Sequence, residues 1–101
     1  MTRAESEFQS KVRELGCICC LKFLHVFSPC SIHHMLNGAN RRMGEMFVLG
    51  LCRYHHQGGC NNELYVSRHP WRKAFVERYG TEAELLAQTR RLVAYARELA
   101  G

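Results

Sequence analysis

Two short pairs of metal-binding residue types constrain this chain more than any other feature. The first pair has the spacing C-x-x-C, and the second, after a long intervening stretch, has the spacing C-x-x-H. Two residues between ligands let both side chains of a knuckle or a helical turn converge on one ion, and four such ligands suit a tetrahedral zinc. The spacing therefore predicts a closed structural Zn²⁺ site. Its ligands are Cys17, Cys20, Cys52 and His55.

The other three cysteines leave part of the ligand set open. A buried free cysteine behaves as a small hydrophobe, and this is the simplest reading of any cysteine taken alone. Cys30 is the most credible substitute ligand, whereas Cys19 and Cys60 are expected to stay unliganded.

The N-terminal segment and the hydropathy pattern bear on the compartment. Residues 1–7 are acidic and polar where a secretory signal would be basic and then apolar, and no run of 18 apolar residues occurs. This predicts a cytoplasmic protein without a membrane partner, in which reducing conditions favour metal ligation over disulfides. The alternative is a secreted, disulfide-stapled protein, which would resist chelators and lose its structure on reduction.

Length, composition and net charge limit the number of domains and the kind of partner only broadly. A chain of 101 residues is long enough for one domain and too short for two, and 47% hydrophobic with 23% charged residues excludes a chain disordered throughout. The net charge of +5 makes an anionic partner plausible. Charge alone does not decide this, because a small basic protein can simply be soluble.

The periodicity predicts an α+β fold with helices on either side of a metal-held hairpin. Residues 1–16 form a helix that Gly16 closes with a left-handed αL cap. Residues 17–62 hold strands at 31–34 and 47–51, then a short helix at 52–57 that Gly58 ends. Residues 69–100 form two helices, the first with Pro70 in its first turn and the second capped by Thr81 with Glu84. The second helix has a predicted core face of Leu85, Leu86, Leu92, Val93, Ala96 and Leu99.

Two histidine doublets suggest a second, open metal site. His33 and His34 end the first strand, and His56 lies in the short helix after the second strand, so the three could meet across a ββα unit. A metal held by two or three side chains keeps positions open for a phosphate oxygen and water. Neighbouring residues on a regular strand point to opposite faces, so His33 and His34 can both serve one site only at a frayed or bulged strand end. A single histidine of this kind is more often a hydrogen-bonded core residue.

These motifs resemble the HNH, or ββα-metal, endonucleases, and most closely their Ref-like branch, which is named after a RecA-dependent phage nuclease. The resemblance covers about residues 17–86. One departure is Phe47, which stands where many HNH proteins have an asparagine. The matching segments are Cys17-Ile18-Cys19-Cys20, Ile32-His33-His34, the stretch from Gly50 to His56, Gly58-Gly59, His69, Phe75 and Tyr79-Gly80-Thr81-Glu82.

The resemblance implies an endonuclease that hydrolyses phosphodiester bonds of DNA. It implies His34 as the general base, His33 and His56 as ligands of a catalytic Mg²⁺, Mn²⁺, Ni²⁺ or Zn²⁺, and His69 as a possible third ligand. Without the resemblance, His69-Pro70 reads as a helix boundary. The phage protein has a basic N-terminal extension, whereas a short acidic-to-neutral helix precedes Cys17 here, so a RecA partner does not follow from this chain.

Arginines near these motifs are candidate phosphate contacts. Arg41 and Arg42 lie in the predicted hairpin loop, and Arg53 begins the short helix. Exposed arginines are more often solvent-exposed surface residues without a ligand. Arg68, Arg72 and Lys73 are candidates of the same kind, either as phosphate contacts or as surface residues. Residues 1–101 are thus predicted to form one HNH-type nuclease domain. The alternative is a non-catalytic zinc module that binds nucleic acid or protein.

Overall fold

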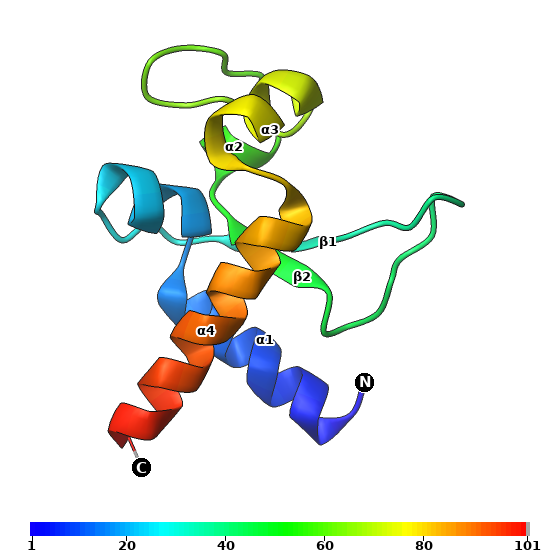
Figure 1. The fold of residues 1–101 in the computed structure, drawn as a ribbon, viewed down its shortest axis with the longest axis vertical. Helices are drawn as coiled ribbons and strands as arrows, with labels where there is room; N and C mark the ends of the chain where they lie inside the picture. The colour runs from blue at the N-terminus through cyan, green and yellow to red at the C-terminus, as the bar shows by residue number, and fades with distance from the viewer. Residues whose placement is uncertain (101) are drawn as a thin grey trace.

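The computed structural model describes residues 1–100, and the side chains of residues 1–99; Gly101, the last residue of the predicted domain, lies outside the described residues. The fold is α+β, as predicted, with a two-stranded sheet and flanking helices (Figure 1). The elements are α1 (Arg3–Leu15), the π-helix η1 (Cys20–Leu24), β1 (Ser31–His34), β2 (Val48–Leu51), α2 (Arg53–His56), α3 (Arg72–Tyr79) and α4 (Glu82–Ala100).

The first helix begins at a capping box and ends at a glycine. The Thr2 hydroxyl accepts a hydrogen bond from the Glu5 N–H, and the Glu5 carboxylate accepts one from the Thr2 N–H, an arrangement that contributes about 1 kcal/mol. Gly16 has φ +77° and ψ −155°, so the predicted αL cap is wrong. The glycine is needed for close approach, because a Cβ here would overlap the Ser28 carbonyl oxygen to which Cys17 N–H donates.

The hairpin is regular and carries the centre of the core. β1 and β2 are antiparallel, with His33 opposite Leu49 and His34 opposite Val48. Every residue of β2 is buried, because α1, α2 and α4 all contact this strand (Figure 1). Pairing continues beyond β1, where Met35 N–H donates to the Phe47 carbonyl at 2.9 Å. The frayed or bulged strand end that was expected for a shared histidine site is therefore absent from the described hairpin.

In α4, the predicted N-terminal cap is confirmed, whereas only part of the predicted core face is buried. Thr81 and Glu84 form the reciprocal capping hydrogen bonds at 3.0 and 3.1 Å. Leu85, Leu86 and Val93 are buried and Leu92 is half-buried. Ala96 and Leu99 are exposed, because α4 runs on past the hairpin and α1 (Figure 1).

Two local features differ from the sequence-based expectation. Pro70 precedes α3, which has Trp71 as its N-cap, so this proline does not lie in the first turn. The π-helix η1 was not predicted, since its five residues are too few to display a period. None of the described helices is long and apolar enough to cross a membrane.

Candidate metal centres

The four residues predicted for structural zinc lie together. Cys17 follows α1, Cys20 begins η1, Cys52 caps α2 and His55 lies within α2; their ligand atoms are all within 4.8 Å of one another. The Sγ atoms of Cys20 and Cys52 are 3.7 Å apart, and His55 Nδ1 lies 3.2 to 3.5 Å from the three sulfurs. Tetrahedral zinc bonds of about 2.3 Å to sulfur and about 2.0 Å to nitrogen give sulfur–sulfur separations of about 3.8 Å and sulfur–nitrogen separations of about 3.5 Å. The residues present therefore fit zinc.

The site is buried, and its three thiols differ in how readily they lose a proton. Cys17, Cys20 and His55 have no exposed surface. Hydrogen bonds with Cys19 and Cys52 outweigh burial and lower the pKa of Cys17, whereas burial raises the pKa of Cys20 and the hydrogen bond with Cys17 raises that of Cys52. One thiolate is therefore favoured without an ion, and a bound cation would have to stabilise the other two. The role of the four residues as zinc ligands stays a prediction.

Tyr79 fixes the orientation of the histidine in this cluster. With His55 Nδ1 facing the sulfurs, its Nε2–H points to Tyr79 Oη at 3.0 Å, and the same oxygen accepts a hydrogen bond from the buried Val66 N–H at 3.1 Å. A hydrogen bond at the ring nitrogen that does not face the metal sets the tautomer of a ligating histidine. The sequence marks Tyr79 only as part of the matching segment Tyr79-Gly80-Thr81-Glu82, with no role at the zinc site.

The remaining cysteines lie outside the four-residue cluster. Cys19 is fully buried beside Cys17, Cys30 Sγ is 3.9 Å from the Val12 carbonyl oxygen, and Cys60 Sγ is 3.7 Å from that of Gly58.

A second cluster joins His33, His56 and His69, with ligand atoms that are also within 4.8 Å of one another. His33 Nδ1 is 3.1 Å from His56 Nε2. Two nitrogens bound to one metal at about 2.1 Å and at right angles lie about 3.0 Å apart, so this pair fits adjacent positions on one ion. His33 is buried, His56 half-buried and His69 exposed, which leaves the cluster open to solvent on one side. Its geometry differs from that of the closed cysteine site.

The histidines are held in the form that binds metals. Burial, followed by the nearby His33 and His69, lowers the pKa of His56 to about 4. Burial, followed by the positive charge of Arg68, lowers the pKa of His69. Both imidazoles are therefore neutral near pH 7, with a lone pair available to a cation.

Glu82, at the start of α4, is a site residue that the sequence reasoning did not assign. Its Oε2 lies 3.2 Å from His33 Nε2, and its Oε1 accepts a hydrogen bond from Arg68 Nε at 2.6 Å. Burial acts to raise the pKa of Glu82, but the hydrogen bonds with His33 and Arg68 outweigh it and lower the pKa to about 2. An ionised carboxylate only accepts, so His33 Nε2 carries the proton and His33 Nδ1 is free to face the metal.

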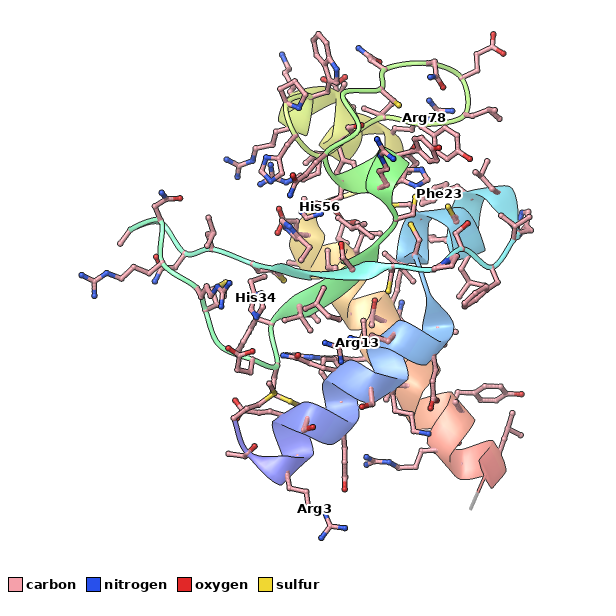
Figure 2. All side chains as sticks on the ribbon, turned by 180° about the vertical axis from the view of Figure 1, so that it is seen from behind. Arg3, Arg13, Phe23, His34, His56 and Arg78 are labelled. Atoms are coloured by element: carbon pink, nitrogen blue, oxygen red, sulfur yellow. The ribbon has the colours of Figure 1, made fainter. Side chains whose placement is uncertain are left out.

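His34 points away from this cluster and has a carboxylate of its own. Figure 2 shows His34 and His56 on opposite sides of the β1 ribbon. Neighbouring residues of a strand point to opposite faces, so His34 faces away from His33, the strand residue that contacts His56. His34 Nε2 lies 3.0 Å from Glu45 Oε2, which also accepts a hydrogen bond at 2.8 Å from the buried Gln9 of α1. Hydrogen bonds with His34 and then Gln9 lower the pKa of Glu45. The ionised carboxylate accepts a hydrogen bond from Nε2–H, so the neutral form of His34 presents Nδ1 as its base atom.

Although they diverge, His33 and His34 border the same cavity of about 270 Å³. β1 pairs with β2 on one edge only in the described sheet, so side chains of both strand faces can reach a space along the other edge. The cavity is also bordered by Ile32, Leu36, Arg42, His56, Arg68, His69 and Glu82.

The predicted phosphate-binding arginines do not gather at one point. Arg42 borders the cavity of the histidines, and Arg53 borders a neighbouring hollow that shares Ile32 and His56 with it. Arg41 is exposed on the hairpin loop. Two of the three thus lie along the same strand edge as the histidine cluster.

Comparison with known proteins identifies the family of the chain. No curated protein matches this chain. Residues 1–94 match the family described as "Recombination enhancement, RecA-dependent nuclease". The match reaches from α1 into α4 and so extends beyond the motifs of the metal centres. The chain belongs to this family of RecA-dependent nucleases.

Proposed function

We propose that this chain is an HNH-type endonuclease that hydrolyses phosphodiester bonds of DNA with a divalent metal and a histidine base. One observation carries the proposal: in a chain of a nuclease family, a three-histidine cluster and a separate carboxylate-paired histidine border the same cavity. The buried cysteine site has the role of holding the ends of α1, β2 and α2 together.

His33, His56 and His69 are the residues that would hold the catalytic metal. A divalent cation bound there would supply Lewis-acid stabilisation of the charge that develops on the phosphate and on the leaving oxygen. Glu82 positions His33 by accepting its Nε2 proton, and Arg68 keeps Glu82 ionised and in place. The partial exposure of His56 and His69 leaves room for a phosphate oxygen.

His34 is the general base. Glu45 holds its imidazole with Nδ1 unprotonated, and this nitrogen takes a proton from water. The resulting hydroxide forms a new bond to phosphorus as the bond between phosphorus and the 3′ oxygen breaks. The leaving 3′ oxygen takes a proton from solvent, so the products are a 5′-phosphate and a 3′-hydroxyl, and His34 returns its own proton to solvent.

The edge of β1 is the proposed path of the DNA backbone. Arg42 and Arg53 stand on either side of Ile32 and His56, where they would contact phosphates that flank the scissile one. Arg68 is paired with Glu82, and its side chain is only 13% exposed. We therefore assign it to the histidine cluster and not to contacts with the DNA backbone.

The test is plasmid nicking with Mg²⁺, Mn²⁺, Ni²⁺ and Zn²⁺, comparing wild type with His34→Ala and His33→Ala. We expect His34→Ala to cut about 10²- to 10⁴-fold more slowly while it still binds one catalytic metal, because its side chain belongs to the base and not to the cluster. His33→Ala should lose both cutting and that metal. Calorimetric metal titration of zinc-loaded protein separates the two defects.

The matched control is Lys11→Gln, which removes a positive charge from the exposed face of α1. Lys11 borders neither the cavity of the histidines nor a cavity between η1 and α4. Because the family is named for RecA dependence, each reaction is run with and without RecA protein. Wild type inert with all four metals under both conditions would leave the non-catalytic zinc module as the better description. An active wild type with an equally active His34→Ala would remove His34 as the general base.

A further inference from the structure

A second and larger cavity lies between η1 and α4. Its volume is about 590 Å³, and it shares no lining residue with the cavity of the histidines. Volumes of roughly 300–1,000 Å³ are typical of small-molecule sites. The α4 residues that line it begin at Gln88, well beyond Glu82 in the first turn of this helix. The cavity is therefore separate from the proposed catalytic site.

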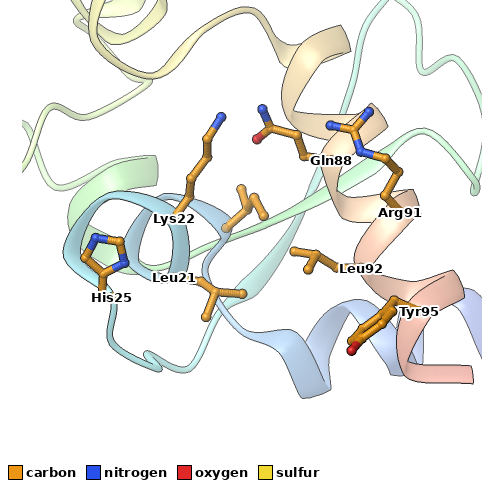
Figure 3. Close-up of a pocket in the computed structure, with 8 residues that line it drawn as sticks. Leu21, Lys22, His25, Gln88, Arg91, Leu92 and Tyr95 are labelled. Atoms are coloured by element: carbon orange, nitrogen blue, oxygen red, sulfur yellow. The ribbon is translucent and has the colours of Figure 1, made fainter. Parts of the chain in front are cut away.

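The cavity has a polar, basic end and a more apolar end. Figure 3 shows the Lys22 amine, the Gln88 amide and the Arg91 guanidinium at one end, and Leu21, His25 and Tyr95 toward the other, with Leu92 between. None of the lining residues is acidic. The cavity is thus complementary to an anion that carries a flat or apolar body.

Gln88 provides a second, independent pointer to a ligand. Its Oε1 is buried, and no donor among the described side chains and backbone hydrogen-bonds to it. Buried carbonyl oxygens in native proteins nearly always accept a hydrogen bond. Because this oxygen has almost no accessible surface, the Gln88 amide would have to rotate toward the cavity before a hydroxyl or amino group of a bound molecule could pair with it.

The aromatic residue favours a base over an aliphatic chain. The Tyr95 side chain lines the cavity and is 60% exposed, which leaves much of its ring accessible. Such rings stack on nucleobases, and arginine and lysine beside them bind phosphate. Tyr95 and Arg91 are four residues apart on one helix, so their side chains lie on the same face.

We propose that this cavity binds a nucleotide. The base packs on Tyr95 and Leu92, the phosphate pairs with Lys22 and Arg91, and a sugar hydroxyl donates to Gln88 Oε1. Two sources share this chemistry, a free nucleotide and the terminal nucleotide of a DNA strand. The site adds a nucleotide contact remote from the histidines, and it does not depend on the proposed catalytic activity.

The test is NMR titration of the zinc-loaded full chain with deoxyadenosine monophosphate, followed at the Gln88 side-chain amide. We expect saturable shifts with Kd between about 10 μM and about 1 mM, and at least tenfold weaker binding of deoxyadenosine or inorganic phosphate alone. Arg91→Ala and Tyr95→Ala should each weaken binding about tenfold or more, whereas Tyr95→Phe retains it. Arg97→Ala, on an exposed part of the same helix, is the matched control.

A dinucleotide with a 5′-phosphate distinguishes the two sources. If the dinucleotide binds more tightly than the mononucleotide, the ligand of the cavity is the end of a DNA strand. If it binds equally or more weakly, the ligand is a free nucleotide. The proposal is overturned if neither ligand shifts Gln88 up to about 5 mM, or if shifts occur only at His33 and His56. Shifts of Gln88 by an acidic peptide but not by nucleotides would also overturn it, because the cavity would then be a protein-docking site.

Discussion

Glu45 Oε2 lies 3.0 Å from His34 Nε2, and the same oxygen accepts a hydrogen bond from Gln9 Nε2 at 2.8 Å. Gln9 is almost fully buried in α1 and also donates to the Glu45 backbone carbonyl. The N-terminal helix therefore braces the hairpin residue that orients the proposed base. The sequence predicts α1 only as a helix that flanks the hairpin, and the structure shows that it also contributes to the geometry of the site.

Glu45→Gln should slow DNA cutting. The neutral amide neither stabilises the proton that His34 takes up nor fixes the tautomer of its ring, so we expect kcat to fall about tenfold or more. Steady-state cutting rates at about pH 7 measure the effect. Glu63→Gln, on an exposed turn, should match wild type, and a wild-type rate for Glu45→Gln would remove Glu45 from the mechanism.

The same substitution should alter acid stability. The hydrogen bonds with His34 and Gln9 lower the pKa of Glu45 from its ordinary value of 4.5 in the folded protein. A carboxyl of this kind contributes stability above its unfolded-state pKa, and this contribution is lost as the pH falls through the folded-state pKa. The difference in urea midpoint between wild type and Glu45→Gln should therefore shrink from about pH 6 to about pH 4. A difference that is constant or grows on acidification would contradict the assigned ion pair.

Glu82→Gln should weaken the binding of the catalytic metal without unfolding α4. Loss of the carboxylate beside His33 removes the contact that fixes its tautomer, and changes of this kind cost about 10- to 100-fold in metal affinity or activity. Titration of Mn²⁺ with the zinc-loaded protein measures the effect. Glu84→Gln is the matched control, because it lies in the same helical turn and a glutamine can still complete the capping box with Thr81. Equal losses in the two variants would indicate a general effect on the helix.

Local spacing predicted most of the framework and the convergence of the candidate ligands. Ser31 to His34 form a strand as expected, and Cys17, Cys20, Cys52 and His55 meet because each pair sits within one turn of chain. Glu45 and Glu82 were missed, since each approaches its histidine through tertiary packing. Glu82 is 49 positions from His33, and no periodic pattern in a single sequence records such a contact.

Removal of the structural metal should unfold the chain. Three buried thiols around one histidine leave little apolar packing to replace the ion, so a strong chelator or Cys52→Ser should lower Tm by at least about 15 °C. Elemental analysis should find one tightly held zinc per chain. Cys60→Ser changes a thiol outside the cluster and should keep both the zinc and the wild-type Tm. Reducing agent without chelator should leave the fold intact, whereas unfolding by reduction alone would favour the disulfide alternative.

Tyr79→Phe tests whether the tyrosine supports the zinc site or only the core. The ring packs against Phe75 and Phe23, and phenylalanine preserves these contacts. Loss of Oη leaves the buried Val66 N–H and His55 Nε2–H without their acceptor, so the free energy of unfolding should fall by about 1–3 kcal/mol. If the Tyr79 hydroxyl has a purely structural role, this loss of stability is the only expected effect. A role in orienting His55 predicts in addition that zinc passes to a competing chelator about 10- to 100-fold more readily, while Tyr95→Phe, which alters an exposed tyrosine, holds zinc like wild type.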